Sequence, residues 1–133
     1  MTEASSNSSA KILVVDDLGS ARKIVRKILA ELGYTNVEEA CDGEEALRKL
    51  EMGDFSLIIS DWEMPKLKGI ELIKKLRERE VYKTLPFIIV TSLNHKEHVM
   101  QAFEAGISDY IAKPFSSEIL GPKLQKLLQT EAD

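Results

Sequence analysis

The stretch KILVVDD, residues 11–17, joins an unbroken apolar segment to two adjacent acids. A strand buried on both faces of a parallel sheet is apolar throughout, whereas a strand with one face in water alternates apolar and polar residues. Residues 12–15 follow the first pattern. We therefore predict a buried strand at residues 11–15 that ends at Asp16 and Asp17.

Three other strand-like segments also end in a polar residue of a chemically useful type. They are residues 56–60 before Asp61, residues 87–90 before Thr91, and residues 109–112 before Lys113. In a parallel sheet, ligands and chemistry collect beyond the carboxyl ends of the strands. We therefore expect these polar residues to converge with Asp16 and Asp17 on one small site, suited to a hard cation and a phosphoryl group.

Helix-like patterns lie between the strands. The first begins at Ser20 as N-cap and ends at Gly33, and it precedes a short polar strand at residues 36–40. The other helices are predicted at residues 44–52, around Ile70, Ile73 and Leu76, around Val99, Ala102 and Phe103 up to Gly106, and around Leu120, Leu124, Leu127 and Leu128. This alternation predicts an α/β fold, a doubly wound five-stranded parallel sheet with helices on both faces.

Length and composition limit the function classes. The chain has 133 residues, so we expect one domain at residues 10–133 after a flexible Ser-rich tail at residues 1–9. A net charge of −4 argues against a nucleic-acid partner. The sequence shows neither a secretory signal nor an apolar run of membrane-span length, so we expect a cytoplasmic monomer with no membrane partner. A lone Cys41 excludes an internal disulfide.

Other polar residues are interpreted as structural. We interpret four basic residues of the first helix as a solvated face rather than a docking surface: Arg22, Lys23, Arg26 and Lys27. His95 and His98 are interpreted as solvated, because no third metal ligand stands nearby. Pro122 lacks a backbone donor, so we expect a kinked first turn or a helix that starts near it.

The paired acids point to a metal ion. Neighbouring carboxylates repel each other and normally recruit a cation, and helix capping would explain only one of the two. Ligands that are all oxygens favour Mg²⁺, with Mn²⁺ as an alternative, over zinc. A carboxylate held beside such a cation, here Asp61, can attack a phosphoryl group. Lys113 and Thr91 would offset charge on the phosphoryl oxygens.

Four motifs in this order resemble the receiver domain of two-component response regulators, in particular the stand-alone chemotaxis regulators. They are Asp16-Asp17, Asp61-Trp62-Glu63-Met64-Pro65, Thr91-Ser92, and Tyr110 with Lys113-Pro114-Phe115. The resemblance covers nearly the whole chain from Lys11 onward. It implies a flavodoxin-like sheet with the strand order 2-1-3-4-5.

The resemblance also implies a role for each residue of the acidic site. Asp61 would be the phosphoacceptor of a histidine kinase. Asp17 and Asp61 would bind Mg²⁺ directly, Asp16 through water, and Glu63 through its backbone carbonyl. Phosphorylation would then be a stoichiometric signal rather than an enzymatic turnover, although the domain would assist its own phosphotransfer and dephosphorylation.

Further roles concern the switch and the lifetime of the phosphate. Thr91 and Tyr110 would form the switch pair, and Lys113 would contact the phosphate. The switched surface would be made by the fourth helix, the fifth strand and the fifth helix. Glu63 and Leu93 stand where the chemotaxis regulators typically carry Asn and Glu, so we expect these two positions to tune hydrolysis.

The partners implied are a sensor histidine kinase and one of several downstream proteins. A flagellar switch protein would make the chain a motor effector, whereas a histidine-phosphotransfer protein would make it a relay intermediate; an adaptor role and a phosphatase partner stay open. The sequence continues for about one helix after Lys113-Pro114, so we expect no output domain.

Two competing functions are weaker. Metal-dependent phosphatases with an aspartyl nucleophile carry Asp-x-Asp after the first strand, whereas this chain has Asp16-Asp17-Leu18 there. A flavin or nucleotide carrier of this fold needs a phosphate-binding loop rich in Gly and hydroxyl groups at the same place, and two acids would repel phosphate.

Overall fold

The computed structural model describes residues 9–92 and 96–129. The predicted positions Leu93 and His95 and nearly all of the predicted tail therefore lie outside the described residues. The elements are β1 (Ile12–Val15), α2 (Gly19–Glu31), β2 (Val37–Ala40), α3 (Gly43–Met52), β3 (Leu57–Asp61), α4 (Gly69–Arg77), the 3-10 helix η1 (Glu80–Tyr82), β4 (Phe87–Thr91), α5 (Lys96–Ala105), β5 (Asp109–Ala112) and α6 (Ser117–Gln129).

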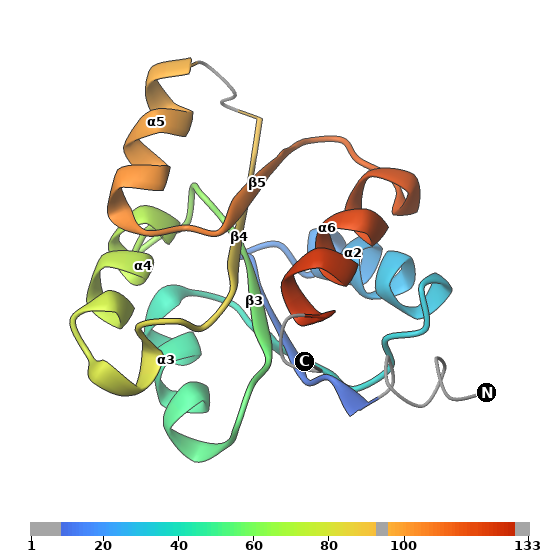
Figure 1. The fold of residues 1–133 in the computed structure, drawn as a ribbon, viewed down its shortest axis with the longest axis horizontal. Coiled ribbons are helices and arrows are strands. Elements are labelled where there is room, and N and C mark those ends of the chain that lie inside the picture. Colours follow the sequence, from blue (N-terminus) through green and yellow to red (C-terminus); the bar gives the residue numbers. More distant parts are fainter. Residues whose placement is uncertain (1–8, 93–95, 130–133) are drawn as a thin grey trace.

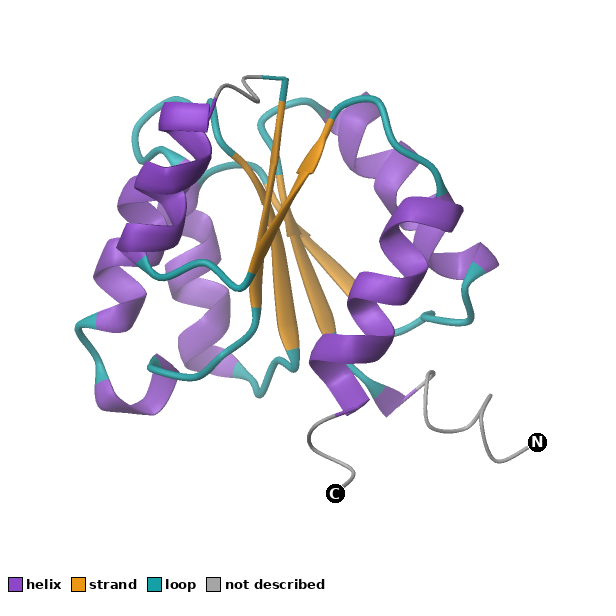
Figure 2. Cartoon of the chain, turned by 45° about the horizontal axis from the view of Figure 1, so that its top comes forward, coloured by secondary structure: helices purple, strands orange, loops and turns teal. Residues whose placement is uncertain are grey.

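All five strands are parallel and lie in the order β2-β1-β3-β4-β5. Helices α2 and α6 cover one face of the sheet, and α3, α4 and α5 cover the other (Figures 1 and 2). The α/β prediction of a doubly wound, flavodoxin-like sheet is confirmed. In the described part of the chain, no helix has the length and apolar character needed to cross a membrane.

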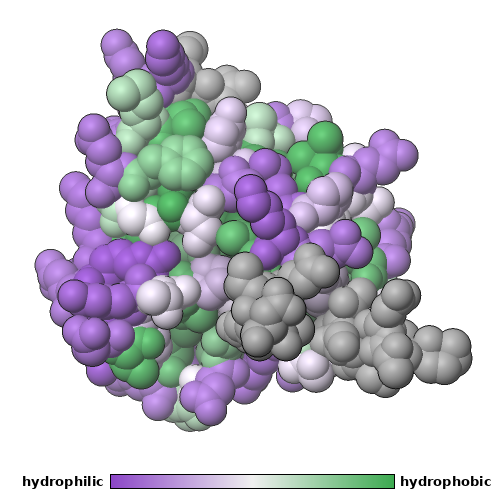
Figure 3. All heavy atoms as spheres, in the orientation of Figure 1, coloured by the Kyte–Doolittle hydropathy of each residue, from purple (hydrophilic) through white to green (hydrophobic). Residues whose placement is uncertain are grey.

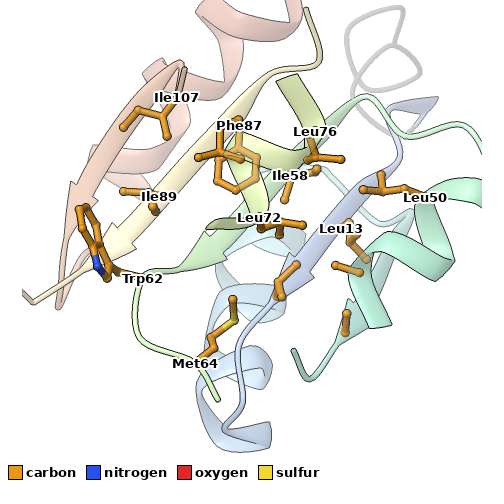
Figure 4. Close-up of a cluster of buried hydrophobic side chains, with 14 of the residues drawn as sticks. Leu13, Leu50, Ile58, Trp62, Met64, Leu72, Leu76, Phe87, Ile89 and Ile107 are labelled. Carbon is orange, nitrogen blue, oxygen red and sulfur yellow. The ribbon is translucent and has the colours of Figure 1, made fainter. Parts of the chain in front are cut away.

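The core consists of two hydrophobic clusters, one on each face of the sheet. Leu13, Ile58 and Ile89 point toward α3, α4 and α5 (Figure 4), and the alternate residues of the same strands point toward α2 and α6. Every residue of β1, β3 and β4 is buried. Burial on both faces is why these strands are apolar up to the polar residues at their carboxyl ends.

The ends of α2 test the predicted start and stop signals. Gly33 has φ 95° and follows the helix, where its amide donates to Ala30 while Tyr34 donates to Leu29, so the predicted stop is confirmed. The predicted N-cap at Ser20 is wrong, because the N-cap is Leu18, two residues earlier, and the helix begins at Gly19.

Helices α5 and α6 each depart from the sequence pattern. Phe103, one of the apolar residues that predict α5, is 45% exposed, and in α5 only Ala102 is buried. Helix α6 begins at Ser117, more than a turn before Pro122, so Pro122 lies inside the helix rather than at its start.

Strand β2 forms one edge of the sheet, and two cations cover its outer side. Strand β1 donates to alternate carbonyl groups of the β2 segment, so the carbonyls of Val37 and Glu39 face away from the sheet. Arg26 of α2 donates to the carbonyl of Val37 at 3.0 Å, and Lys49 of α3 donates to that of Glu39 at 2.7 Å. The flanking helices therefore satisfy these two outward-facing carbonyl groups.

The interpretation of the basic residues on α2 as a solvated face is confirmed for Lys23, Arg26 and Lys27, which are exposed, and is wrong for Arg22, whose side chain is only 19% exposed. Arg22 and Arg26 both pair with Glu39, at 2.6 Å and 3.4 Å. Glu39 lies on strand β2, so the helical periodicity of α2 could not predict these contacts.

Helix α3 is capped by Asp42. Its Oδ1 accepts from the amide of Glu45 at 2.8 Å, and the Glu45 carboxylate accepts from the amide of Cys41 at 2.7 Å. The hydrogen bond from the Glu45 amide holds the pKa of Asp42 below its ordinary value, and the Cys41 amide does the same for the pKa of Glu45.

We expect Asp42→Ala to lower the free energy of unfolding by about 1 kcal/mol at pH 7, the usual worth of such a cap. Because the pKa of Asp42 is lower in the folded protein, its ionisation stabilises the fold at pH values above the pKa of Asp42 in the unfolded chain. This stabilisation disappears as the pH falls through the pKa of Asp42 in the folded protein. The difference between variant and wild type should therefore shrink below about pH 4. Urea unfolding at pH 7 and at acid pH measures it, with Asp42→Asn as a control that keeps a capping oxygen; a difference independent of pH would contradict the charge contribution.

Candidate functional site

The carboxyl ends of three central strands meet at one edge of the sheet. Asp61 is the last residue of β3 and Thr91 the last of β4, while Asp16 directly follows β1. Val15 pairs with Ser60 and Asp61 pairs with Val90, so the three polar residues stand side by side. The predicted convergence of these strand ends is confirmed.

Three acids form the floor of the site. One carboxylate oxygen each from Asp16, Asp17 and Asp61 can be chosen so that all lie within 4.8 Å of one another. Asp16 is 5% exposed and Asp61 9% exposed, whereas Asp17 faces solvent. Three carboxylates without a nitrogen or sulfur donor in this group suit a hard cation of the Mg²⁺ type.

Lys113 is the cation that balances part of this charge. Its Nζ lies 3.2 Å from Asp61 Oδ1 and 3.6 Å from Asp16 Oδ2. Burial is the largest single effect and lowers the pKa of Lys113, but the combined attraction of Asp61 and Asp16 outweighs it and leaves this pKa raised. The Lys113 amide also donates to the carbonyl of Thr91 at 2.9 Å, and the bond between Lys113 and Pro114 is cis.

Asp61 is held in an unfavourable electrostatic setting. Burial, followed by repulsion from Asp16, raises its pKa above the ordinary value, and the attraction of Lys113 opposes this only in part. Oδ1 accepts a hydrogen bond from the Trp62 amide at 2.9 Å. A carboxylate with unmet negative charge beside two other acids is therefore ready to gain from a bound cation.

Asp16 combines a local and a site role. Its Oδ1 accepts from the amide of Leu18 at 3.0 Å, just before α2 begins. Arg22 of α2 donates to the carbonyl of Asp16 at 2.6 Å. This contact could not be predicted from the sequence, where its one signal is a basic residue six positions after Asp16.

Gly69 is a second residue that sequence reasoning missed. Its amide donates to the carbonyl of Trp62 at 3.0 Å and so closes the loop between β3 and α4. A Cβ atom at this position would overlap the carbonyl oxygen of Asp61. The loop therefore passes directly against the backbone of Asp61, and only a residue without a side chain fits there.

The predicted switch residues lie on neighbouring strands. Thr91 is 2% exposed at the end of β4, and Tyr110 of β5 is half-buried and pairs with Ile89. The Tyr110 ring makes an edge-to-face contact with Phe103 of α5, at a centroid distance of 6.4 Å. Tyr110 thus connects β5 to α5.

Two further positions surround the site. Glu63 is exposed, and Leu93, the second predicted hydrolysis-tuning residue, is outside the described residues. His98 is half-buried rather than solvated, since its ring makes an edge-to-face contact with Trp62 at a centroid distance of 5.6 Å. The residue next to Asp61 therefore packs against α5, in the cluster that Figure 4 shows.

Comparison with known proteins agrees with this geometry. Residues 12–125 match the family of the response regulator receiver domain. The chain is 42% identical over 127 residues to the chemotaxis protein CheY-3 of Vibrio cholerae, which covers 96% of this chain and 98% of that protein.

Solved structures show the same architecture. The chemotaxis protein CheY4 of Vibrio cholerae matches with a TM-score of 0.83 and 39% identity over 90% of this chain and 98% of that one. The receiver domain of a sensor histidine kinase from Pseudomonas aeruginosa, solved with a magnesium ion coordinated in its active site cleft, matches with a TM-score of 0.82 and 29% identity, again over 90% of this chain and 98% of that one.

Proposed function

Because this chain belongs to the response regulator receiver domain family, we propose that it is phosphorylated on Asp61 by a sensor histidine kinase in a Mg²⁺-dependent reaction. Receiver domains are signalling domains, and here Asp61 would act as a stoichiometric acceptor. The observation that supports this most is the position of Asp61 at a strand end beside Asp16, Asp17 and Lys113.

In the proposed reaction, a carboxylate oxygen of Asp61 attacks the phosphorus of a phosphohistidine. A bond forms between oxygen and phosphorus, the bond between phosphorus and the imidazole nitrogen breaks, and that nitrogen keeps the electron pair. Lys113, 3.2 Å from Asp61, and the hydroxyl of Thr91 would stabilise negative charge on the phosphoryl oxygens.

The carboxylates of Asp17 and Asp61 would hold Mg²⁺ directly, with Asp16 acting through water and Glu63 through its carbonyl. The donor set fits this ion, since it offers only oxygen atoms and a net negative charge. When bound, Mg²⁺ supplies positive charge to the phosphoryl oxygens. Glu63 and Leu93 would set how long the phosphate lasts.

Thr91 and Tyr110 would pass the phosphorylated state to the surface made by α5, β5 and α6. Tyr110 already contacts α5 through Phe103. Apolar side chains reach the surface over α5 (Figure 3), where Met100 is 53% and Phe103 is 45% exposed. Such a surface could bind a protein partner in one state and release it in the other.

We propose a cytoplasmic role in chemotaxis, because a chemotaxis protein is 42% identical over nearly the whole chain. The alternative is a relay intermediate that passes phosphate to a histidine-phosphotransfer protein. A binding experiment separates these roles: the phosphorylated and the unphosphorylated chain are each tested for capture by an immobilised flagellar switch protein and by an immobilised phosphotransfer domain. Repeated hydrolysis of a phosphoester substrate would instead favour the metal-dependent phosphatase.

Removal of Mg²⁺ tests the proposal itself. With EDTA, we expect labelling by a phosphorylated histidine kinase to fall to background, and restored Mg²⁺ should bring it back. Mg²⁺ should also raise the melting temperature, because a ligand at 100 times its Kd stabilises by about 2.7 kcal/mol. Without metal, Asp16→Asn should raise the melting temperature by removing repulsion.

The two measurements are independent. Labelling that is equally fast in EDTA would contradict a metal-dependent transfer, and a melting temperature indifferent to both Mg²⁺ and Asp16→Asn would contradict a shared acidic pocket.

A further inference from the structure

Arg22 links three parts of the fold behind the acidic pocket. It lies in the first turns of α2, and its side chain is 19% exposed. Nη1 donates to the carbonyl of Asp16 at 2.6 Å, and Nε donates to Oε1 of Glu39 on β2 at 2.6 Å. The guanidinium of Arg22 is ionised, so both hydrogen bonds are charge-assisted, which is the stronger class of hydrogen bond.

The carbonyl that Arg22 binds belongs to the peptide between Asp16 and Asp17. The direction of this peptide plane sets the directions in which both side chains leave the backbone. The Asp16 amide donates to the carbonyl of Ala40 at 3.1 Å, and its carboxylate accepts from Leu18. Arg22 therefore completes a set of contacts that hold the amide, the carboxylate and the carbonyl of Asp16.

We propose that Arg22 is a positioning residue for the acidic pocket: the Glu39-anchored guanidinium fixes the Asp16–Asp17 peptide so that the two carboxylates face Asp61. This inference rests on the proposed Mg²⁺ site. Glu39 contributes by holding the Arg22 side chain in place, and it does not touch the pocket acids itself in the contacts that the structure gives.

Two physical roles for Arg22 predict effects of opposite sign. As a positive charge near the three acids, Arg22 would repel a bound Mg²⁺ ion, so removing the charge would strengthen Mg²⁺ binding. As a positioning residue, it preorganises the ligands, so removing it would weaken Mg²⁺ binding. Partners that orient metal ligands typically account for about 10–100-fold in metal affinity.

The test compares Arg22→Met with Arg26→Met. The two arginines lie one turn apart on α2 and both pair with Glu39, but Arg26 donates to Val37 rather than to Asp16. We expect Mg²⁺ affinity, followed by the fluorescence of Trp62, to fall roughly tenfold in Arg22→Met. Arg26→Met should change it by less than about twofold, since the charge lost there lies farther along the helix.

A second readout needs no metal. In the metal-free protein, amide hydrogen exchange at Asp17 and Leu18 should become faster in Arg22→Met and stay unchanged in Arg26→Met. Arg22→Lys keeps the charge but loses the two-pronged contact, so it should resemble Arg22→Met in both readouts.

The outcomes separate the two proposals. Unchanged or tighter Mg²⁺ binding in Arg22→Met, with wild-type exchange at Asp17 and Leu18, would overturn the positioning role. An equal loss of affinity in Arg26→Met would also overturn it, because it would show a general effect of helix α2. A wild-type chain with no response to Mg²⁺ in fluorescence or melting temperature would overturn the metal site itself.

Discussion

Asp61→Asn should reduce phosphoryl incorporation from acetyl phosphate in Mg²⁺ to background, a fall of more than about 10³-fold. The substitution replaces the attacking carboxylate by an amide of the same size, whose oxygen is a poor nucleophile. Incorporation is measured by mass spectrometry or by radiolabel from a phosphorylated kinase. Persistent full labelling of the variant would show that another residue is the acceptor.

The same variant should stay folded, which makes the loss of labelling interpretable. Burial and repulsion from Asp16 raise the pKa of Asp61 in the folded protein. The ionised carboxylate therefore destabilises the metal-free fold at pH values above the pKa that Asp61 has in the unfolded chain. An uncharged Asn removes that cost, and we expect its melting temperature in EDTA at pH 7 to equal or exceed that of the wild type. Asp17→Asn is the matched control for this melting measurement, since it also removes one acid from the pocket.

Gly69→Ala should lower the free energy of unfolding by about 2–4 kcal/mol, in the upper range for overpacking. The new methyl group would overlap the carbonyl oxygen of Asp61 and lie 3.3 Å from Cδ1 of Ile89. Neither neighbour can move easily, because both belong to buried central strands. Denaturant unfolding measures the loss, and phosphorylation should slow as well because the clash displaces Asp61.

Gly19→Ala is the control for Gly69→Ala. Both glycines are the first residues of helices, but a Cβ at Gly19 would meet only the end of the Arg22 side chain, at 3.5 Å. Alanine has a higher helix propensity than glycine, so Gly19→Ala should be neutral or stabilise by up to about 1 kcal/mol. Equal losses in the two variants would contradict the steric explanation.

The sheet could be predicted from the sequence because its signal is local. Residues 12–15, 57–59 and 87–90 are apolar because the central strands that they form are buried on both faces. The polar residues at the strand ends were then placed at one edge by the geometry of parallel sheets alone. The contacts of Lys113 with Asp16 and Asp61 follow from that geometry.

The features that were missed depend on partners distant in the sequence. Arg22 and Glu39 are 17 positions apart, and nothing in the helical pattern of α2 distinguishes Arg22 from an exposed lysine. Gly69 looked like an ordinary loop glycine, because the carbonyl that excludes a side chain there lies across the loop, on β3. Phe103 fits the apolar stripe of α5 but is 45% exposed, whereas Ala102 of the same helix is buried.

The cations on the edge of β2 have a consequence for self-association. An exposed edge strand is a template on which a second molecule can add a strand, and such pairing leads to dimers or aggregates. Here a strand of a second molecule would have to displace Arg26 from the carbonyl of Val37 and Lys49 from that of Glu39 before it could pair with β2. The sheet is thereby protected from extension at β2 by a second copy of the chain.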